Sequence, residues 1–267
     1  IFKQQIAEMV ENHRHHPSII AWGVGNELDG QCDETIQYIK DAIAYAHIID
    51  PEREASYVTN RVYENPAKDG TTDGDFMMIN DYIGTWHGDL DQYKEWNQVV
   101  KMNPDKPMVP SEFGLCEPAF AGGDTRRNEI FLEKMTCYRK YPNIAGTIYF
   151  CLNDYRTQMG EEGEGKLRQR VHGSTDLCGN PKPSYHTVAR ECAPVTLEKE
   201  GTKVKITCRD NLPCYTVKGY QLVTVNGEKR EQISIPTLLP GMSWTTELSE
   251  ETAVQIVRTN GEIVTQK

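Results

Sequence analysis

The chain has 267 residues, of which 38% are hydrophobic and 25% charged, and its net charge at pH 7 is −10. Such an acidic chain lacks the basic footprint of a nucleic-acid-binding protein, and no stretch approaches the ~18 apolar residues that a membrane span needs. We therefore expect neither a nucleic-acid nor a membrane partner, and a polar, neutral or weakly charged ligand fits the composition better.

Up to about residue 190, patterns typical of helices and strands alternate along the chain. The sequence opens inside an amphipathic helix over residues 1–16, which predicts an excerpt of a longer protein and leaves its localisation and oligomeric state open. Apolar runs predict five strands, at 18–27, 54–59, 75–80, 106–112 and 144–151. Strands that alternate with helices favour an α/β fold with a parallel sheet.

Past residue 193 the pattern changes to short segments in which apolar and polar residues alternate, as they do in half-buried strands. Asn226-Gly227 and Asn260-Gly261 are hairpin turn signals. We predict two domains: residues 1–193, which hold the α/β part, and residues 194–267, which form a small all-β immunoglobulin-like sandwich with an accessory role.

Glu27 and Glu112 are the candidate catalytic residues, because each ends a short apolar run. A carboxylate at the carboxyl end of a buried strand is costly to desolvate and is seldom placed there for packing. Two such residues from different parallel strands predict an acid and a nucleophile on either side of one bond, as in retaining glycoside hydrolases. The alternative is a pair of solvated loop glutamates.

Four segments together resemble glycoside hydrolase family 2, the β-galactosidase and β-glucuronidase group. The stretch from His16 to Glu27 is similar to the acid/base signature that closes the fourth barrel strand, and Ser111 to Gly114 is similar to the nucleophile motif on the seventh. Asn80-Asp81-Tyr82 with Trp86, and residues 179–185, resemble the sixth strand and the exit from the barrel. The resemblance implies a (β/α)8 TIM barrel, of which strands four to eight lie in this chain.

The resemblance implies a double-displacement mechanism in which Glu27 is the acid/base and Glu112 the nucleophile. Their carboxyl groups should then lie ~5–5.5 Å apart, against ~6.5–9.5 Å in an inverting enzyme. The candidate substrate-binding residues are Asn26, Tyr82, Trp86, His87, Phe150 and Asp154.

Each of these candidates also has a purely structural alternative. Asn26 would bind the sugar 2-hydroxyl or serve as a strand-end turn residue, and Tyr82 would orient Glu112, keep it charged and lower its pKa, or be a buried tyrosine. Trp86 and Phe150 would stack on the sugar, although the family more often has tryptophan at position 150. His87 is also interpreted as a structural loop residue. Asp154 would bind a hydroxyl or pair with Arg156.

The type of sugar depends on the segment from Lys166 to Gly173. It lacks the Asn-x-Lys element by which β-glucuronidases of the family hold the sugar carboxylate, although Lys166, Arg168 and Arg170 would still supply positive charge. We therefore place a β-galactoside or a related oligosaccharide first, with β-glucuronide and β-mannoside as alternatives.

Two further classes of function stay open. A non-catalytic carbohydrate-binding or structural fragment is one, and an endo-β-mannanase or cellulase of the same clan is the other. The eight cysteines show no metal-ligand spacing. We expect neither a metal nor a cofactor.

Overall fold

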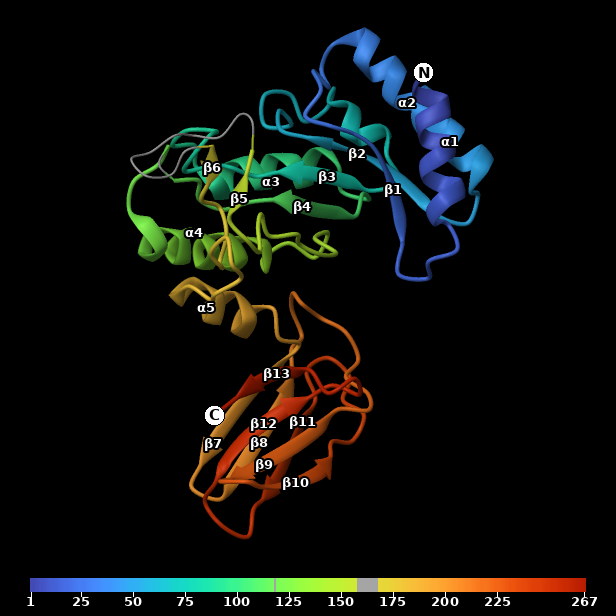
Figure 1. Cartoon of the computed structure of the whole chain (residues 1–267). Coiled ribbons are helices and arrows are strands. Elements are labelled where there is room, and N and C mark those ends of the chain that lie inside the picture. The colour runs from blue at the N-terminus through green and yellow to red at the C-terminus, as the bar shows by residue number, and fades with distance from the viewer. Residues whose placement is uncertain (118, 158–167) are drawn as a thin grey trace. The chain divides into compact units, whose positions relative to one another are not determined.

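The computed structural model describes residues 1–117, 119–157 and 168–267, and it divides into two compact units, Ile1–Gly173 and Ser174–Lys267. Figure 1 shows the first unit as helices arranged around a sheet and the second mainly as strands. The short helix α5 (Pro183–Glu191) falls in the second unit. The domain boundary at 193/194 stays a prediction.

The first unit is built on a parallel sheet in the order β1-β2-β3-β4. Its strands and the helices between them have the following bounds: α1 Phe2–His13, β1 Ala21–Asn26, α2 Asp33–Ile49, β2 Glu54–Thr59, β3 Met77–Asn80, α3 Gln92–Met102, β4 Met108–Glu112 and α4 Gly123–Tyr138. A short 3-10 helix, Gly70–Asp73, precedes β3. Four of the five predicted strands are thus present as regular strands.

The fifth predicted strand, residues 144–151, is not a regular strand in this structure. It runs parallel to β4 over a short distance, with one bridge between Met108 and Ile144 and hydrogen bonds from Ala145 N to Met108 O and from Ile148 N to Pro110 O, both 2.9 Å long. Beyond it, two-residue strands β5 (Tyr155–Arg156) and β6 (Gln169–Arg170) pair with each other.

The two faces of the sheet differ because side chains alternate along each strand. Trp22, Val24, Ala55 and Tyr57 face α1 and α2 and pack with them into one buried cluster. The other face bears a largely apolar groove of about 730 Å³, whose lining includes Ile20, Val58, Met78, Val109, Ala145 and Ile148. Ile20 is 82% exposed and Ile148 51%, so this groove is open to solvent.

The second unit contains two antiparallel sheets. One has the order β10-β9-β12-β13 and the other β11-β8-β7. Buried residues of both sheets, among them Ile206 and Ile256, form a single core. The strand bounds are β7 Val195–Glu200, β8 Lys203–Cys208, β9 Gln221–Asn226, β10 Lys229–Ser234, β11 Ser243–Glu247, β12 Ala253–Val257 and β13 Ile263–Gln266. The predicted turn at Asn226-Gly227 joins β9 to β10, and Gly227 has a φ of 59°.

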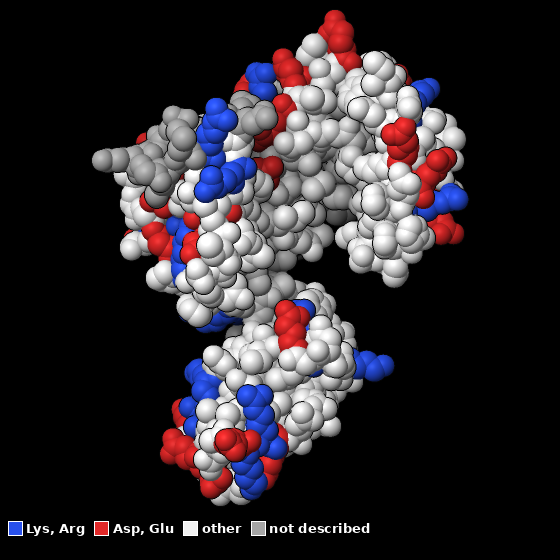
Figure 2. All heavy atoms as spheres, viewed as in Figure 1, with Lys and Arg blue, Asp and Glu red and all other residues white. Residues whose placement is uncertain are grey.

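Figure 2 shows acidic and basic side chains interspersed on the visible face of the described residues. None of the helices in the described part is long and apolar enough to cross a membrane.

Candidate active site

The two candidate glutamates lie at the same end of the sheet. Glu27 follows β1, and Glu112 is the last residue of β4. Both line one pocket of about 480 Å³, together with residues that follow β2 and β3. Because the carboxyl ends of parallel strands share one edge of a sheet, side chains 85 positions apart in the sequence meet there.

Ten of the described residues line the pocket: Asn26, Glu27, Asn60, Tyr82, Trp86, His87, Glu112, Phe150, Arg170 and His172. Seven of the eight predicted site residues are in this set. The eighth, Asp154, is not among them. It is buried, and its Oδ1 accepts a hydrogen bond of 2.9 Å from the backbone N–H of Gly173.

Asn80 connects the two glutamate-bearing strands. Its Nδ2 donates to Glu27 Oε1 at 2.8 Å and to Asn26 Oδ1 at 3.2 Å, while its Oδ1 accepts from Ser111 Oγ at 2.8 Å. Asn80 is fully buried, so these contacts fix its side chain and, through it, the position of the Glu27 carboxylate.

Glu112 accepts a hydrogen bond from Tyr82, whose O–H donates to Glu112 Oε2 at 2.9 Å. Burial, the largest influence, raises the pKa of Glu112, and the nearby charge of Glu27 acts in the same direction. Hydrogen bonds from Tyr82 and Asn80 and the charge of Arg170 oppose this rise. Tyr82 therefore acts in the predicted direction, but the net pKa of Glu112 is raised, because desolvation disfavours the charged form more strongly.

Glu27 has an unusual backbone conformation. Its φ of 53° lies in the left-handed region, which non-glycine residues seldom adopt and which the surrounding structure must hold in place. The register between β1 and β2 shifts between Gly23 and Asn26, just before this residue, and Glu27 N donates to Val58 O at 3.0 Å. The side chain of Glu27 is exposed, in contrast to the half-buried Glu112.

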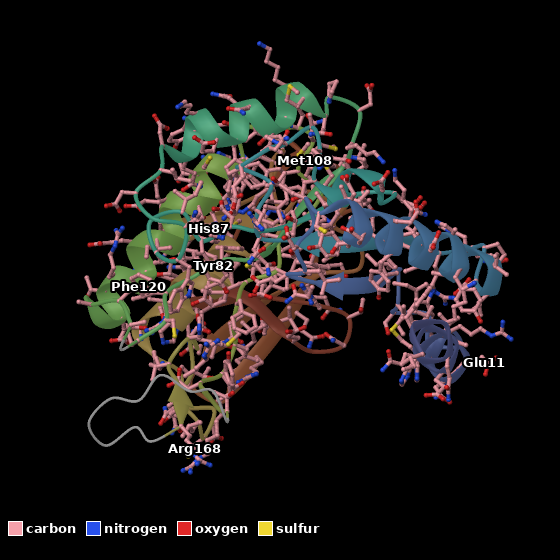
Figure 3. All side chains as sticks on the ribbon, turned by 90° about the horizontal axis from the view of Figure 1, so that it is seen from above. Glu11, Tyr82, His87, Met108, Phe120 and Arg168 are labelled. Atoms are coloured by element: carbon pink, nitrogen blue, oxygen red, sulfur yellow. The ribbon has the colours of Figure 1, made fainter. Side chains whose placement is uncertain are left out.

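His87 and Tyr82 lie close together in the loop after β3, as Figure 3 shows. The Tyr82 backbone N–H donates to His87 Nδ1 at 3.2 Å. Burial lowers the pKa of His87, and a ring nitrogen that accepts a hydrogen bond belongs to the neutral form, whose proton is then on Nε2. His87 is thus anchored to the loop and also lines the pocket.

Aromatic side chains form another part of the wall. Trp86 packs edge-on against Phe120 with ring centroids 4.7 Å apart, and Phe150 packs edge-on against Tyr155 and His172. Aromatic faces of this kind are suited to contact the apolar faces of a ligand such as a sugar ring.

Among the described residues, Arg170 supplies positive charge to the pocket. The sequence named three candidates, Lys166, Arg168 and Arg170. Lys166, with the segment 161–166, lies outside the described residues. Arg168 is exposed and projects outwards in Figure 3, whereas Arg170 lines the pocket. Within the described part of the chain, no three His, Cys, Asp or Glu side chains are grouped to hold a metal ion.

The sequence reasoning missed Asn60 and His172 as lining residues, as well as the linking role of Asn80. Asn60 directly follows β2, so the rule that identified the two glutamates applies equally to it. His172 follows β6 in an irregular region, where no periodic pattern points to the pocket.

The family model described as "Glycosyl hydrolases family 2, TIM barrel domain" matches residues 1–142, which is more than half of the chain. The chain belongs to glycoside hydrolase family 2. The TIM-barrel part of the predicted fold is thereby confirmed, with β1 to β4 as part of the barrel sheet.

Several β-glucuronidases and a β-galacturonidase are similar to parts of this chain. The β-glucuronidase of Sus scrofa is 27% identical over 117 residues, which are 40% of this chain and 17% of that protein. Two solved structures, a Faecalibacterium prausnitzii β-glucuronidase and an Eisenbergiella tayi β-galacturonidase bound to galacturonate, are 23% and 20% identical, each with a TM-score of 0.60. Each alignment covers 70% of this chain, and 33% and 36% of those chains, respectively. This chain therefore matches only a minor part of the length of these relatives.

Proposed function

We propose that this family 2 chain carries the active site of a retaining exo-β-glycosidase that releases terminal β-linked uronic acids, with β-glucuronides as the first choice. The observation that carries the proposal is the convergence of Glu27, Glu112 and Arg170 on one pocket of about 480 Å³. Two carboxylates supply the acid and the nucleophile, and a guanidinium suits a ligand carboxylate.

In the first step, Glu112 attacks the anomeric carbon while the bond to the aglycone oxygen breaks and Glu27 donates a proton to that oxygen. This forms a glycosyl ester on Glu112. In the second step, Glu27 takes a proton from water, the water oxygen bonds to the anomeric carbon, and the ester bond breaks. Both glutamates then return to their starting protonation states.

The contacts of the two glutamates support these roles. Tyr82, Asn80 and Arg170 all favour the ionised form of Glu112, which a nucleophile needs, and they offset part of the effect of burial. Glu27 is exposed and accepts a hydrogen bond from Asn80, so its carboxyl group is held in position and stays accessible to an aglycone oxygen.

The choice of a uronic acid revises the order of substrates that the sequence favoured. The relatives carry the names β-glucuronidase and β-galacturonidase, and these favour the uronide alternative over the galactoside. Arg170 in the pocket supports the same choice, because a charged hydrogen-bond donor there gains more from a carboxylate than from a neutral hydroxymethyl group.

The first experiment offers nitrophenyl β-glucuronide, β-galacturonide, β-galactoside and β-mannoside to the full-length protein. We expect the uronides to be hydrolysed with the highest kcat/KM and the first product to retain the β configuration, as NMR would show. Hydrolysis of none of the four would favour a binding or structural role, and an α product would exclude the double displacement.

The catalytic roles are tested by substitution in the same full-length protein. Glu112→Gln should abolish turnover, while Glu27→Ala should spare substrates with good leaving groups, because these need little protonation. Glu129→Gln, at an exposed carboxylate on α4, serves as the matched control. Activity of Glu112→Gln equal to that of the control would remove the nucleophile assignment.

The sugar specificity is tested through Arg170→Gln. Loss of a hydrogen bond between charged groups costs ~1.5–3 kcal/mol, so kcat/KM for the β-glucuronide should fall about 10- to 100-fold. The corresponding neutral β-glucoside should lose much less. An equal loss for both sugars would mean that Arg170 does not bind the carboxylate.

We further propose that the second unit is an immunoglobulin-like accessory domain. Two antiparallel sheets that share one apolar core support this proposal.

A further inference from the structure

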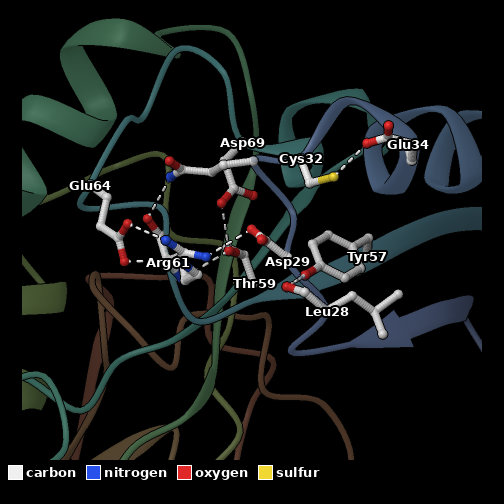
Figure 4. A network of polar contacts seen from close by, with 10 residues as sticks. Leu28, Asp29, Cys32, Glu34, Tyr57, Thr59, Arg61, Glu64 and Asp69 are labelled. Carbon is white, nitrogen blue, oxygen red and sulfur yellow. Dashed lines mark hydrogen bonds and ion pairs between the residues drawn. The ribbon is translucent and has the colours of Figure 1, made fainter.

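The turn that follows Glu27 is tied to the loop after β2 by side chains from both segments (Figure 4). Residues 28–31 form this turn, and it begins directly after the left-handed backbone of Glu27. A strained non-glycine conformation persists only where neighbouring contacts hold it. The contacts of the turn therefore bear on where the Glu27 carboxyl group lies.

Arg61 makes the contacts that join the two segments. Its Nη1 donates to Asp29 Oδ1 at 2.8 Å, and its backbone oxygen accepts from Gln31 Nε2 at 2.8 Å. Its Nε and Nη2 donate to the two carboxylate oxygens of Glu64 at 2.9 and 2.7 Å. The planar guanidinium thus has its orientation fixed by a two-point contact on one side and holds the turn on the other.

The end of β2, which lies shortly before Arg61, is buried and held by hydrogen bonds. The backbone N–H of Arg61 donates to Thr59 Oγ1 at 3.0 Å, and Thr59 Oγ1 donates to Asp69 Oδ2 at 2.7 Å. Tyr57 OH donates to Leu28 O at 2.7 Å, which fixes the first residue of the turn from below. Arg61 is therefore held on a rigid strand end and directly follows Asn60, a residue of the pocket wall.

These ion pairs contribute little to folding stability. The side chains of Arg61, Asp29 and Glu64 are 39%, 57% and 56% exposed, and exposed pairs are worth ~0–1 kcal/mol. Removal of Arg61 should then leave the fold intact and act mainly on the geometry of the turn.

We propose that Arg61 is a positioning residue for Glu27, which keeps the acid/base carboxyl group in line with the leaving oxygen by clamping turn 28–31 to the loop after β2. This inference rests on the proposed function of Glu27. It has a specific kinetic consequence, because Glu27 protonates the aglycone oxygen in the first step. If the acid is misplaced, hydrolysis of glycosides with poor leaving groups slows strongly, whereas hydrolysis of those with activated leaving groups slows little.

The kinetic test compares the Arg61→Met variant of the full-length protein with the unsubstituted protein. The substrates are aryl β-glucuronides whose leaving groups range from dinitrophenol to phenol. Because the exposed pairs of Arg61 with Asp29 and Glu64 are worth up to ~1 kcal/mol each, kcat/KM for the phenyl glycoside should fall by up to about 30-fold. The dinitrophenyl glycoside should lose less than about 3-fold. Arg126→Met, which removes a similar set of ion pairs with Glu129 and Glu133 on α4, is the control and should change neither.

Two kinetic outcomes would overturn the inference. The first is an equal loss along the whole leaving-group series, which would indicate a general structural effect. The second is no loss with any substrate. In both cases Arg61 would not act through the acid.

Hydrogen exchange supplies a readout that needs no turnover. The amides of Gly30 and Cys32 are bonded within the turn, to Leu28 O and Asp29 O, and should exchange faster in Arg61→Met but not in Arg126→Met. Unchanged exchange would refute the clamp itself. If the full-length protein cleaves no glycoside, the proposed function fails, whereas the exchange result still decides whether Arg61 holds the turn.

Discussion

The buried pair of Lys134 and Asp81 allows a quantitative prediction. Lys134 Nζ lies 2.7 Å from Asp81 Oδ1, and the two side chains are 2% and 0% exposed. Lys134→Met removes the ammonium and leaves a buried carboxylate without its counter-charge. Breaking such a pair costs ~3–5 kcal/mol.

Asp81 keeps several hydrogen bonds in Lys134→Met, so we expect a cost near the lower end of this range. Trp96 Nε1 and Tyr138 OH still donate to its Oδ2 at 2.9 and 2.8 Å, and Ile83 N donates to its Oδ1 at 3.2 Å. We therefore expect Lys134→Met to lower the free energy of unfolding by about 3 kcal/mol.

The pH dependence has a definite sign. Burial disfavours the charge on Asp81, but the Lys134 ammonium and the hydrogen bonds from Trp96 and Tyr138 outweigh it and lower the pKa of Asp81. A lowered carboxyl pKa gives stability that is present above the unfolded value of about 4 and is lost as the pH falls through the folded value. The difference between the parent and Lys134→Met should therefore narrow below pH ~4.

The assay is urea unfolding at pH 7 and at lower pH, followed by tryptophan fluorescence. Three of the four tryptophans lie in the first unit, which holds the pair. Arg126→Met is the control, at a partly exposed side chain, and should cost less than ~1 kcal/mol. A loss below ~1 kcal/mol for Lys134→Met, or a difference that widens in acid, would refute the reasoning.

Three further changes test other contacts. Tyr82→Phe removes the donor to Glu112, so kcat should fall about 10- to 100-fold and the acid limb of the kcat/KM profile should move to higher pH; an unmoved limb would contradict this. Gly114→Ala puts a Cβ 2.6 Å from the Phe150 carbonyl oxygen, so Phe150 must shift. We expect kcat/KM to fall and the free energy of unfolding to drop by ~1–3 kcal/mol. Unchanged kinetics would count against Phe150 as a residue of the pocket wall. Ile206→Ala opens the second core and should cost ~2–5 kcal/mol in denaturant unfolding; a smaller loss would mean that the core closes around the change.

The sequence predicted the part of the site that depends on strand order. Glu27 and Glu112 could be found because each closes an apolar run, and parallel strands bring such ends together. The family resemblance added the aromatic and amide positions, of which Asn26, Tyr82, Trp86 and Phe150 line the pocket.

What the sequence could not predict depends on register and on burial. Asn80 reaches Glu27 across β2, where local shifts in strand register set the positions of both residues, and no periodic pattern encodes such shifts. The net rise of the Glu112 pKa was not predicted either, because the extent of desolvation follows from packing around the side chain and not from its neighbours in sequence. The segment at 144–151 has the composition of a strand but makes only a short pairing with β4.

The open apolar groove along β1 has a practical consequence for anyone who prepares this polypeptide. Exposed, mostly apolar grooves of this size that border an edge strand favour aggregation. These 267 residues, produced alone, should bind the dye ANS and precipitate at high concentration. Replacement of Ile20 by lysine should reduce both effects, because a charge at the rim keeps water there.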